Sequence, residues 1–191
     1  CKSCHSCIAV RIPVNAYSLR RIDRRTYRAN ADISIQQCPA NYLPEHFELY
    51  TKYLRKRHPG GGMDNSSPVD FRQFFFSDWS ETELWEFRNH DQQLIAVSVC
   101  DFVGNALSAV YTFYDTDFLH LSPGRYTVLK QIEIARELEK DYLYLGYWIP
   151  ECKKMAYKID FLPAEVFINE DWMFVENRPS LEKLINNESR L

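Results

Sequence analysis

Apolar and polar residues alternate along several short stretches, which is the pattern of strands with one buried face. In residues 8–14 (IAVRIPV), every second position is Ile or Val. Residues 94–103 and 107–115 are rich in β-branched and aromatic residues and flank the turn sequence Gly-Asn-Ala, which predicts a β-hairpin or meander. Residues 142–149 (YLYLGYWI) predict one more strand.

Helical spacing is found in three other stretches. Residues 45–58 place Phe47 and Tyr50 three apart and close on basic side chains, as suits the C-terminal dipole of a helix. Residues 122–141 begin with Ser-Pro-Gly and predict a helix of about 15 residues. Residues 152–160 predict a further, short helix. Strands and helices in this order predict an α/β or α+β fold.

Charge is unevenly divided along the chain. Of the 23 Lys and Arg and 26 Asp and Glu in the chain, residues 1–60 hold 11 and 4, so the remaining residues are strongly acidic. A basic segment is what phosphate recognition needs, because each neutralised phosphate releases a counterion. Two interpretations stay open: a surface that binds nucleic acid, or an ordinary solvated face rich in arginine.

Composition places the chain among folded globular proteins, since 46% of its residues are hydrophobic and 15% aromatic. No apolar run approaches the roughly 18 residues of a membrane span, and no segment has the character of a signal peptide. We expect a cytoplasmic protein with no membrane partner, in which Cys100 and Cys152 are buried free thiols. The chain opens on Cys1 rather than Met, so we expect further N-terminal sequence in the complete protein.

Cys1, Cys4 and Cys7 form a CxxCxxC motif, a spacing that suits a metal. Three thiolates need a fourth ligand to close a zinc site, and His5, Cys38 or a residue outside this chain are the candidates. The alternative is a set of reduced structural thiols.

The segment SPGRYT (122–127) follows a predicted strand and begins a predicted helix. Backbone N–H groups at such a helix N-terminus bind phosphate, and acetyltransferase-type folds hold the pyrophosphate of coenzyme A in this way. This segment lacks the fuller glycine-rich pattern of those enzymes, so an ordinary helix cap is the competing interpretation.

Several uncommon strings in the same order carry a family resemblance. They are CKSCHSCIAVRIPV, RRIDRRTYRAN, LYTKYLRKRHPGGGMD, LSAVYTFYD, SPGRYTVLKQIEIAR, YLYLGYWI and CKKMAYKIDFLPAE followed by Trp172. Over about residues 1–172 the chain resembles the bacterial aspartate/glutamate leucyltransferases, relatives of the eukaryotic arginyl-tRNA–protein transferases. It departs from that family at Ser122-Pro123-Gly124, where Ser-Leu-Gly is usual, and it lacks the family's upstream Gly-Phe-Arg-Arg-Ser-like stretch.

The resemblance implies an acetyltransferase-like (GNAT-like) α/β fold, in which a mixed sheet has flanking helices. Two fused acetyltransferase-like halves would form this fold. It implies an enzyme that takes an amino acid from aminoacyl-tRNA, leucine or arginine, and joins it to proteins beginning with Asp or Glu, marking them for N-degron proteolysis. The implied transfer reaction requires no cofactor. Related enzymes nevertheless have cysteine clusters linked to iron–sulfur binding, so zinc or an iron–sulfur cluster is a candidate at the N-terminal cysteines. We divide the chain into a cysteine-containing basic region, 1–60, and a catalytic region, 61–191.

Aminoacyl-tRNA is an activated ester, so its attack by an amine needs alignment, removal of a proton and stabilisation of the oxyanion. No Ser/His/Asp or Cys/His arrangement is visible, which fits direct transfer. On the predicted strand 107–115, Tyr111 and Asp115 share one face and Tyr114 lies on the other. We expect Asp115 to orient the acceptor amine and Tyr111 or Tyr114 to relay the proton. The alternative is that both tyrosines are core aromatics.

Recognition of an acidic N-terminal residue calls for a cation. The candidates within family-like motifs are Arg11, Arg57, Lys154 and Lys158, with Tyr157 adjacent, and a solvated face is the alternative for either lysine. Arg125 is expected to lie near the phosphate of the terminal adenosine of tRNA. The rest of the acceptor end is expected to contact Arg20, Arg21, Arg24, Arg25, Arg28, Ser122 and Gly124.

Two other functions fit parts of the sequence. An N-acetyltransferase that uses acyl-coenzyme A would share the fold, but it predicts the glycine-rich loop that this chain lacks. A non-catalytic RNA-binding module would explain the arginines but not the acidic, motif-rich second half. Binding of coenzyme A, or of RNA without transfer, distinguishes them.

Overall fold

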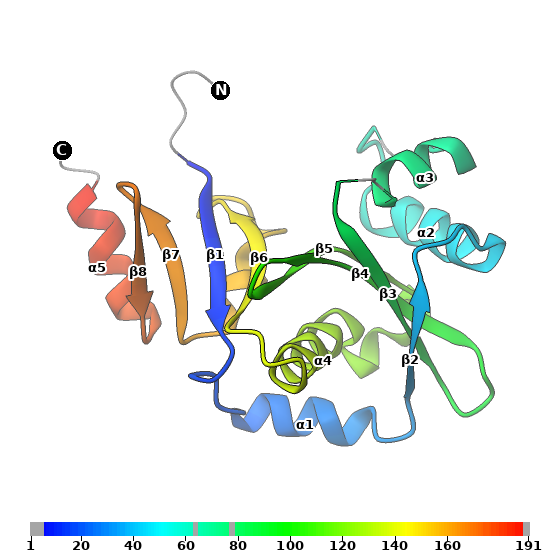
Figure 1. Ribbon diagram of the computed structural model, residues 1–191, viewed down its shortest axis with the longest axis horizontal. Helices are drawn as coiled ribbons and strands as arrows, with labels where there is room; N and C mark the ends of the chain where they lie inside the picture. The colour runs from blue at the N-terminus through cyan, green and yellow to red at the C-terminus, as the bar shows by residue number, and fades with distance from the viewer. Residues whose placement is uncertain (1–5, 63–64, 77–78, 189–191) are drawn as a thin grey trace. The chain divides into compact units, whose positions relative to one another are not determined.

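The computed structural model describes residues 6–62, 65–76 and 79–188 (Figure 1). The chain divides into two compact units assembled from stretches far apart in the sequence. Unit 1 consists of Cys1–Ser18, Asn105–Ser108 and Ile132–Leu191. Unit 2 consists of Leu19–Gly104 and Ala109–Gln131. The division into regions 1–60 and 61–191 rests on sequence character and stays a prediction.

Unit 2 contains a four-stranded arrangement in the order β2-β3-β4-β5, in which β2, β3 and β4 are antiparallel. Its elements are α1 (Arg21–Ala29), β2 (Ser34–Pro39), α2 (Pro44–Arg57), α3 (Pro68–Phe75), β3 (Glu81–Arg88), β4 (Leu94–Val103), the end of β5 (Ala106–Tyr114), the 3₁₀ helix η1 (Thr116–Leu121) and the first part of α4 (Pro123–Glu137).

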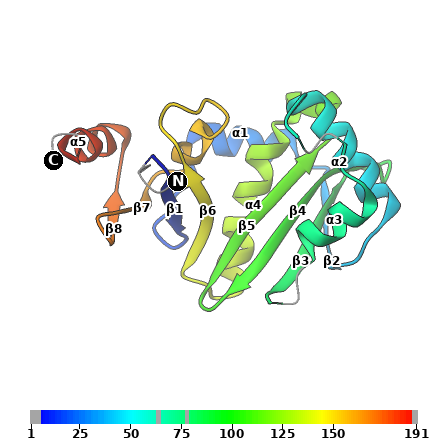
Figure 2. The ribbon, with the colours of Figure 1, turned by 90° about the horizontal axis from the view of Figure 1, so that it is seen from above.

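Helices cover both faces of this sheet. Helices α2 and α3 lie over one face (Figure 2) and bury an aromatic-rich core. In this core, Tyr50 and Phe71 pack against Phe113 of β5. On the other face the Phe87 ring of β3 lies 5.8 Å from the ring of Tyr126 in α4. Because neighbouring residues of a strand point to opposite faces, one sheet supports both helical layers.

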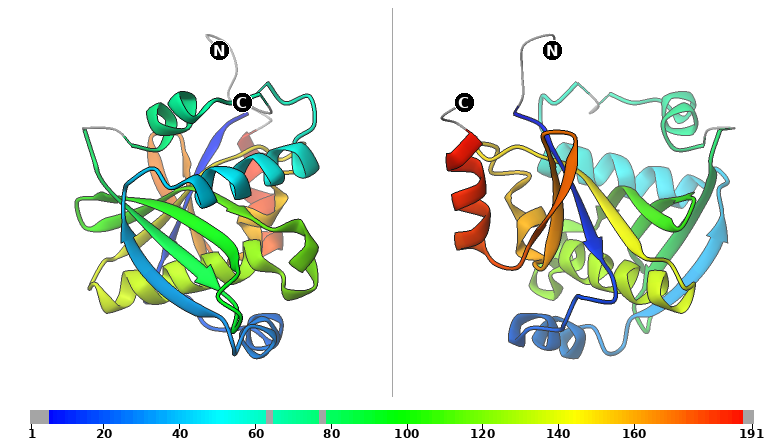
Figure 3. Two further views of the ribbon diagram at one scale, coloured as in Figure 1. Left: turned by 90° about the vertical axis from the view of Figure 1, so that its right-hand side faces the viewer. Right: turned by 60° about the vertical axis from the view of Figure 1, so that its left-hand side comes forward.

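Unit 1 contains a mixed sheet in the order β5-β6-β1-β7-β8. The start of β5 pairs with β6 in parallel, and the other pairs are antiparallel. Its elements are β1 (Ile8–Pro13), the start of β5, the end of α4, β6 (Tyr142–Trp148), the 3₁₀ helix η2 (Ala156–Asp160), β7 (Ala164–Ile168), β8 (Asp171–Val175) and α5 (Arg178–Glu188). Helix α5 lies beside β8 and contributes Leu181 to the core of this unit (Figure 3).

The predicted α/β architecture, a mixed sheet with flanking helices, is confirmed, as are the hairpin of β4 and β5 and the long helix α4. The prediction of a helix over residues 152–160 is wrong, because only Ala156–Asp160 is helical and it is a 3₁₀ helix. Ile159 is the buried side chain of that segment, so no apolar stripe stabilises a longer helix. Among the described residues, no helix has the length and apolar character needed to cross a membrane.

Candidate active site

The end of strand β5 in unit 2 holds a buried carboxylate. Asp115 directly follows the strand and is 4% exposed. Its Oδ1 lies 2.6 Å from Nζ of Lys52 in α2 and accepts a hydrogen bond from the backbone N–H of Asp117. Hydrogen bonds to Asp115 and Asp117 raise the pKa of Lys52. The carboxylate is thus held in place by one cation and one backbone donor.

Tyr114 precedes this carboxylate and lies against the first turn of α4. A Cβ added at Gly124 would lie 3.2 Å from Cε1 and 3.8 Å from the hydroxyl oxygen of Tyr114. The tyrosine also contacts Tyr53 of α2, whose ring centroid is 4.8 Å away. The structure therefore brings together two sets of residues that were predicted separately, the end of the strand and the Ser-Pro-Gly segment.

Tyr111 occupies a different environment, although it belongs to the same strand. Its ring packs against Tyr50 and Phe75 of the aromatic core, with centroids 6.2 and 5.6 Å away. Tyr111 and Phe113 belong to the core that α2 and α3 cover, and the Tyr114 ring contacts the same core through Tyr53, so the predicted alternation of faces does not separate the two tyrosines. Of the two candidate proton relays, Tyr114 is the one beside a helix N-terminus.

The Ser-Pro-Gly segment forms the beginning of α4. Ser122 is exposed and adopts a left-handed conformation with φ of 54°, and Pro123 is the first helical residue. A proline suits that position because its missing N–H would have no partner there. The N-terminal end of α4 carries the partial positive charge of the helix, which favours an anion or a developing oxyanion.

Arg125 makes an ion pair inside unit 2. Its Nε and Nη2 donate to Oδ1 of Asp23, at 2.9 and 2.5 Å. Asp23 is fully buried and also accepts from the backbone N–H of Arg20, which stabilises the start of α1. Arg125 therefore anchors α1 to α4, and its predicted contact with tRNA stays a prediction.

Helix α1 has one anchored face and one basic face. Asp23, Thr26 and Asn30 are buried, and the Asn30 side chain donates to the Leu121 carbonyl before α4. The opposite side and the residue before the helix carry the five exposed arginines that the sequence singled out: Arg20, Arg21, Arg24, Arg25 and Arg28. Such a surface suits the phosphates of a nucleic acid.

In unit 1, Arg11 of β1 is part of a stacked ion pair. It donates through Nε to Glu165 at 2.6 Å, and its guanidinium lies 3.8 Å above the Tyr142 ring and 4.1 Å from the Trp172 ring. Burial disfavours the charge, but hydrogen bonds to Tyr144 and Glu165 outweigh it and raise the pKa of Arg11. The Arg11 side chain is therefore bound by residues of its own unit, Glu165 and Tyr144.

The predicted acceptor-binding lysines also lie in unit 1. Lys158 of η2 is half-buried, donates to the Tyr147 carbonyl at 2.7 Å, and has its pKa lowered to about 8 by burial. Lys154 lies in the turn before η2, so the two lysines do not share a helical face as predicted. Lys154 and Tyr157 are both exposed. Arg57, the last residue of α2, is exposed in unit 2.

The cysteine predictions have mixed outcomes. Cys1 and Cys4 lie outside the described residues, and Cys7 is exposed, so a metal at this motif stays a prediction. Cys100 is buried as predicted, whereas Cys152 is only half-buried.

Sequence reasoning missed Lys52, the cation that holds Asp115. The two residues are 63 positions apart, and a lysine in a basic helix carries no signal that distinguishes it from its solvated neighbours. The helix offers one indication, since Lys52 lies between the buried residues Tyr50 and Tyr53 of α2.

Comparison with known proteins identifies the family. The family described as "Arginine-tRNA-protein transferase, C terminus" matches residues 45–168. An aspartate/glutamate leucyltransferase of Alkalilimnicola ehrlichii is 45% identical over 175 residues, covering 92% of this chain and 73% of that protein. The corresponding protein of Nitrosococcus oceani is 42% identical, with 92% and 74% covered.

Similar solved structures agree on the fold alone. FemX superposes with a TM-score of 0.63 at 11% identity, over 93% of this chain and 63% of that one. On the evidence of the sequence matches, the chain belongs to the aspartate/glutamate leucyltransferases, within the aminoacyl-tRNA–protein transferase family.

Proposed function

We propose that this chain transfers leucine from leucyl-tRNA to the N-terminal α-amine of proteins that begin with Asp or Glu. The observation that carries the proposal is the 45% identity to an aspartate/glutamate leucyltransferase over 92% of the chain. The new peptide bond joins the leucyl carbonyl carbon to the α-nitrogen, and the ribose hydroxyl of the tRNA leaves. The product protein then begins with leucine, and this new N-terminal residue would mark it for N-degron proteolysis.

Tyr114 is the proposed proton relay. Its hydroxyl lies beside the first turn of α4, where the partial positive charge of the helix would stabilise the oxyanion that forms as the amine attacks the ester. A hydroxyl at this place can accept a proton from the attacking amine while it passes its own to the leaving oxygen. Asp115 is buried and bound to Lys52, which supports a role in fixing the end of the strand that carries Tyr114.

Two surfaces are proposed for the substrates. The exposed arginines of α1 would bind the phosphates of the tRNA acceptor end, since they lie on the helix that Asp23 anchors to the start of α4. The exposed side chains Lys154 and Tyr157 of unit 1 are one candidate for binding the carboxylate of the acceptor, and the exposed Arg57 of unit 2 is a separate candidate. Arg11 and Lys158 have internal partners and would shape that site from within their unit.

Arginine is the second candidate donor, because the family description that matches residues 45–168 names arginine-tRNA. The test offers the purified protein radiolabelled leucyl-tRNA or arginyl-tRNA with peptides that begin with Asp, Glu, Lys or Ala. We expect labelled leucine on the Asp and Glu peptides only. Labelled arginine on those peptides would keep the acceptor and overturn the donor, and label on the Lys or Ala peptides would overturn the acceptor.

A further inference from the structure

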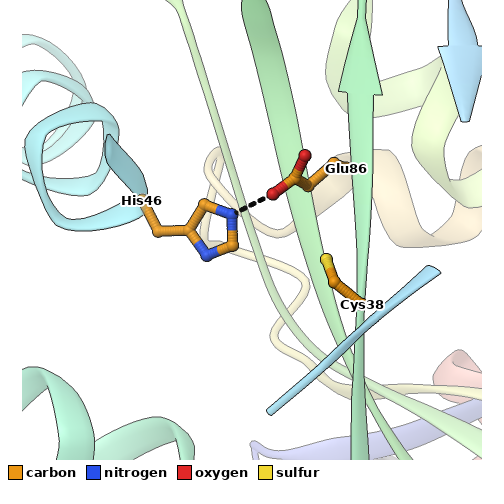
Figure 4. A group of neighbouring side chains, drawn as sticks. All are labelled: Cys38, His46 and Glu86. Atoms are coloured by element: carbon orange, nitrogen blue, oxygen red, sulfur yellow. Dashed lines mark hydrogen bonds and ion pairs between the residues drawn. The ribbon is translucent and has the colours of Figure 1, made fainter. Parts of the chain in front are cut away.

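Three side chains of different chemistry meet at the edge of the sheet in unit 2, away from the end of β5. Cys38 of β2, His46 of α2 and Glu86 of β3 each offer a donor atom, and these atoms lie within 4.8 Å of one another (Figure 4). We call them the Cys38–His46–Glu86 cluster. They come from three elements and are separated by up to 48 positions in the sequence.

The register of the sheet explains the meeting. Cys38 is opposite Leu84, and Gln36 is opposite Glu86. Cys38 and Glu86 are therefore diagonal neighbours on one face, within reach of each other's side chains. Pro44 begins α2 over that face, which places His46 in the first turn above the pair. His46 is 0% exposed and Glu86 6% exposed, whereas Cys38 is half-buried.

One proton, shared between His46 and Glu86, lies where a cation would lie, and the Cys38 thiol donates to the Leu84 carbonyl at 3.6 Å. Nε2 of His46 is 2.6 Å from Oε1 of Glu86, and the other carboxylate oxygen accepts from Nε of Arg88 at 2.6 Å. Burial disfavours ionisation of Glu86, but the hydrogen bonds from Arg88 and His46 outweigh it and lower its pKa. Burial, reinforced by the negative Glu86, raises the pKa of Cys38 to about 11, so the cluster contains a thiol.

The second ring nitrogen of His46 makes no hydrogen bond within the described residues. This nitrogen, Nδ1, is buried. In the tautomer that binds a metal through Nε2, this nitrogen carries the proton instead.

We propose that Cys38, His46 and Glu86 bind a Zn²⁺ ion, with water as the fourth ligand. Thiolate, imidazole and carboxylate are the donors that zinc takes in proteins, and three protein ligands with one water is an established coordination. The ion replaces the thiol proton, which leaves to solvent, while the imidazole proton moves from Nε2 to Nδ1. The two anionic ligands then balance the charge of the ion.

The three ligand atoms, which lie within 4.8 Å of one another, must move by about 1 Å to reach tetrahedral zinc geometry. Zinc bonds of about 2.0–2.3 Å imply that Nε2 and Oε1 move apart by less than about 1 Å. Arg88 stays on the outer carboxylate oxygen, and such a partner orients a ligand toward its metal. The half-buried Cys38 gives a hydrated ion a route to the cluster, and binding would tie the start of α2 to the edge strand.

Cobalt binding tests the proposal, because a Co²⁺–thiolate bond absorbs light by charge transfer. The parent protein is the full chain with Cys1→Ser, Cys4→Ser and Cys7→Ser, which removes the N-terminal thiols. Cys152→Ser is the matched control, since Cys152 is half-buried as Cys38 is. We expect the band in the parent and in the control, its displacement by Zn²⁺, and its loss in Cys38→Ser. A band that survives Cys38→Ser, or no band in the parent, would overturn the proposal.

A second measurement needs no change within the cluster. Alkylation of Cys38 by iodoacetamide, mapped by mass spectrometry, is expected to slow at least tenfold when Zn²⁺ is added to the parent, while alkylation of Cys152 is unchanged. Equal alkylation of Cys38 with and without Zn²⁺ contradicts the proposal even if a substituted variant fails to fold. His46→Gln and Glu86→Gln should each weaken the cobalt band, and full retention in both would show that the ion binds elsewhere.

Discussion

At the scale of single residues, Gly124 and Tyr114 are the pair on which the candidate active site depends. The absence of a side chain at Gly124 lets the Tyr114 ring approach the first turn of α4. Gly124 does not adopt a left-handed conformation, so the glycine is needed for space and not for backbone freedom.

Gly124→Ala tests this interpretation. A separation of 3.2 Å between the new Cβ and Cε1 of Tyr114 forces the ring to shift by a few tenths of an ångström. The cost of crowding, about 1–3 kcal/mol, is partly offset by the better helix propensity of alanine, worth about 1 kcal/mol. We expect a small decrease in Tm and a marked decrease in the transfer rate. Unchanged transfer would show that the position of Tyr114 is unimportant.

Lys158 has a pH-dependent consequence for stability. Its pKa of about 8 in the folded protein lies below the value of about 10.4 for an exposed lysine. Between these values the unfolded protein binds more protons than the folded protein, so the free energy of unfolding rises with pH.

The variant Lys158→Met has no titrating group at this position, so the pH dependence that Lys158 adds to the free energy of unfolding is absent. Urea unfolding of both proteins at about pH 7.5 and about pH 9.5 is therefore expected to show a larger gain in stability for the wild type than for the variant. Equal changes in the two proteins would mean that Lys158 titrates as an exposed lysine does.

At the scale of elements, α1 is the proposed tRNA-binding helix. Its inner face is fixed by Asp23 and Asn30, so substitutions on the outer face should leave the fold intact. Arg21 and Arg25 are both exposed on that outer face.

The double variant Arg21→Gln and Arg25→Gln is expected to weaken tRNA binding and to lower the slope of log affinity against log salt by about 1 for each phosphate that is no longer neutralised. Its Tm should stay within a few degrees of the wild type, because surface substitutions rarely change stability by more than about 0.5 kcal/mol. Lys183→Gln on the exposed side of α5, which removes one charge where the double variant removes two, is the control for charge loss outside α1. An equal effect of both variants would indicate a general charge effect.

The elements with a local signal could be predicted from the sequence. β4 and β5 are rich in β-branched and aromatic residues, and α4 has capping residues and helical spacing, so both strands and the start of the helix were placed within about one residue of their bounds. β2 could not be predicted, because SIQQCP is largely exposed and polar and forms a strand only by pairing with β3. α3 was missed although its capping box, Ser67 with Asp70, is readable in the sequence.

The candidate site was predicted in part for the same reason. Tyr114, Asp115 and Gly124 lie near one another in the sequence, so one strand end and one helix start contain them. The partners that define their environments come from distant positions: Lys52 for Asp115, and Glu86 for Cys38. Long-range pairing of this kind depends on register and packing, which no local pattern encodes.

At the scale of the whole molecule, the basic first 60 residues contain most of the arginines proposed to bind substrates. Each unit has its own core and its own candidate groups. In our proposal, the transfer step depends on the hydroxyl of Tyr114.

Single-turnover transfer of leucine from leucyl-tRNA to an Asp-initiated peptide tests this claim most directly. Tyr114→Phe keeps the ring and its packing against Tyr53 and Gly124 and removes only the hydroxyl. We predict a rate lower by about 10²–10⁴-fold, the usual contribution of a proton relay, with Tyr111→Phe close to the wild type. A wild-type rate in Tyr114→Phe, or an equal loss in Tyr111→Phe, would contradict the assignment.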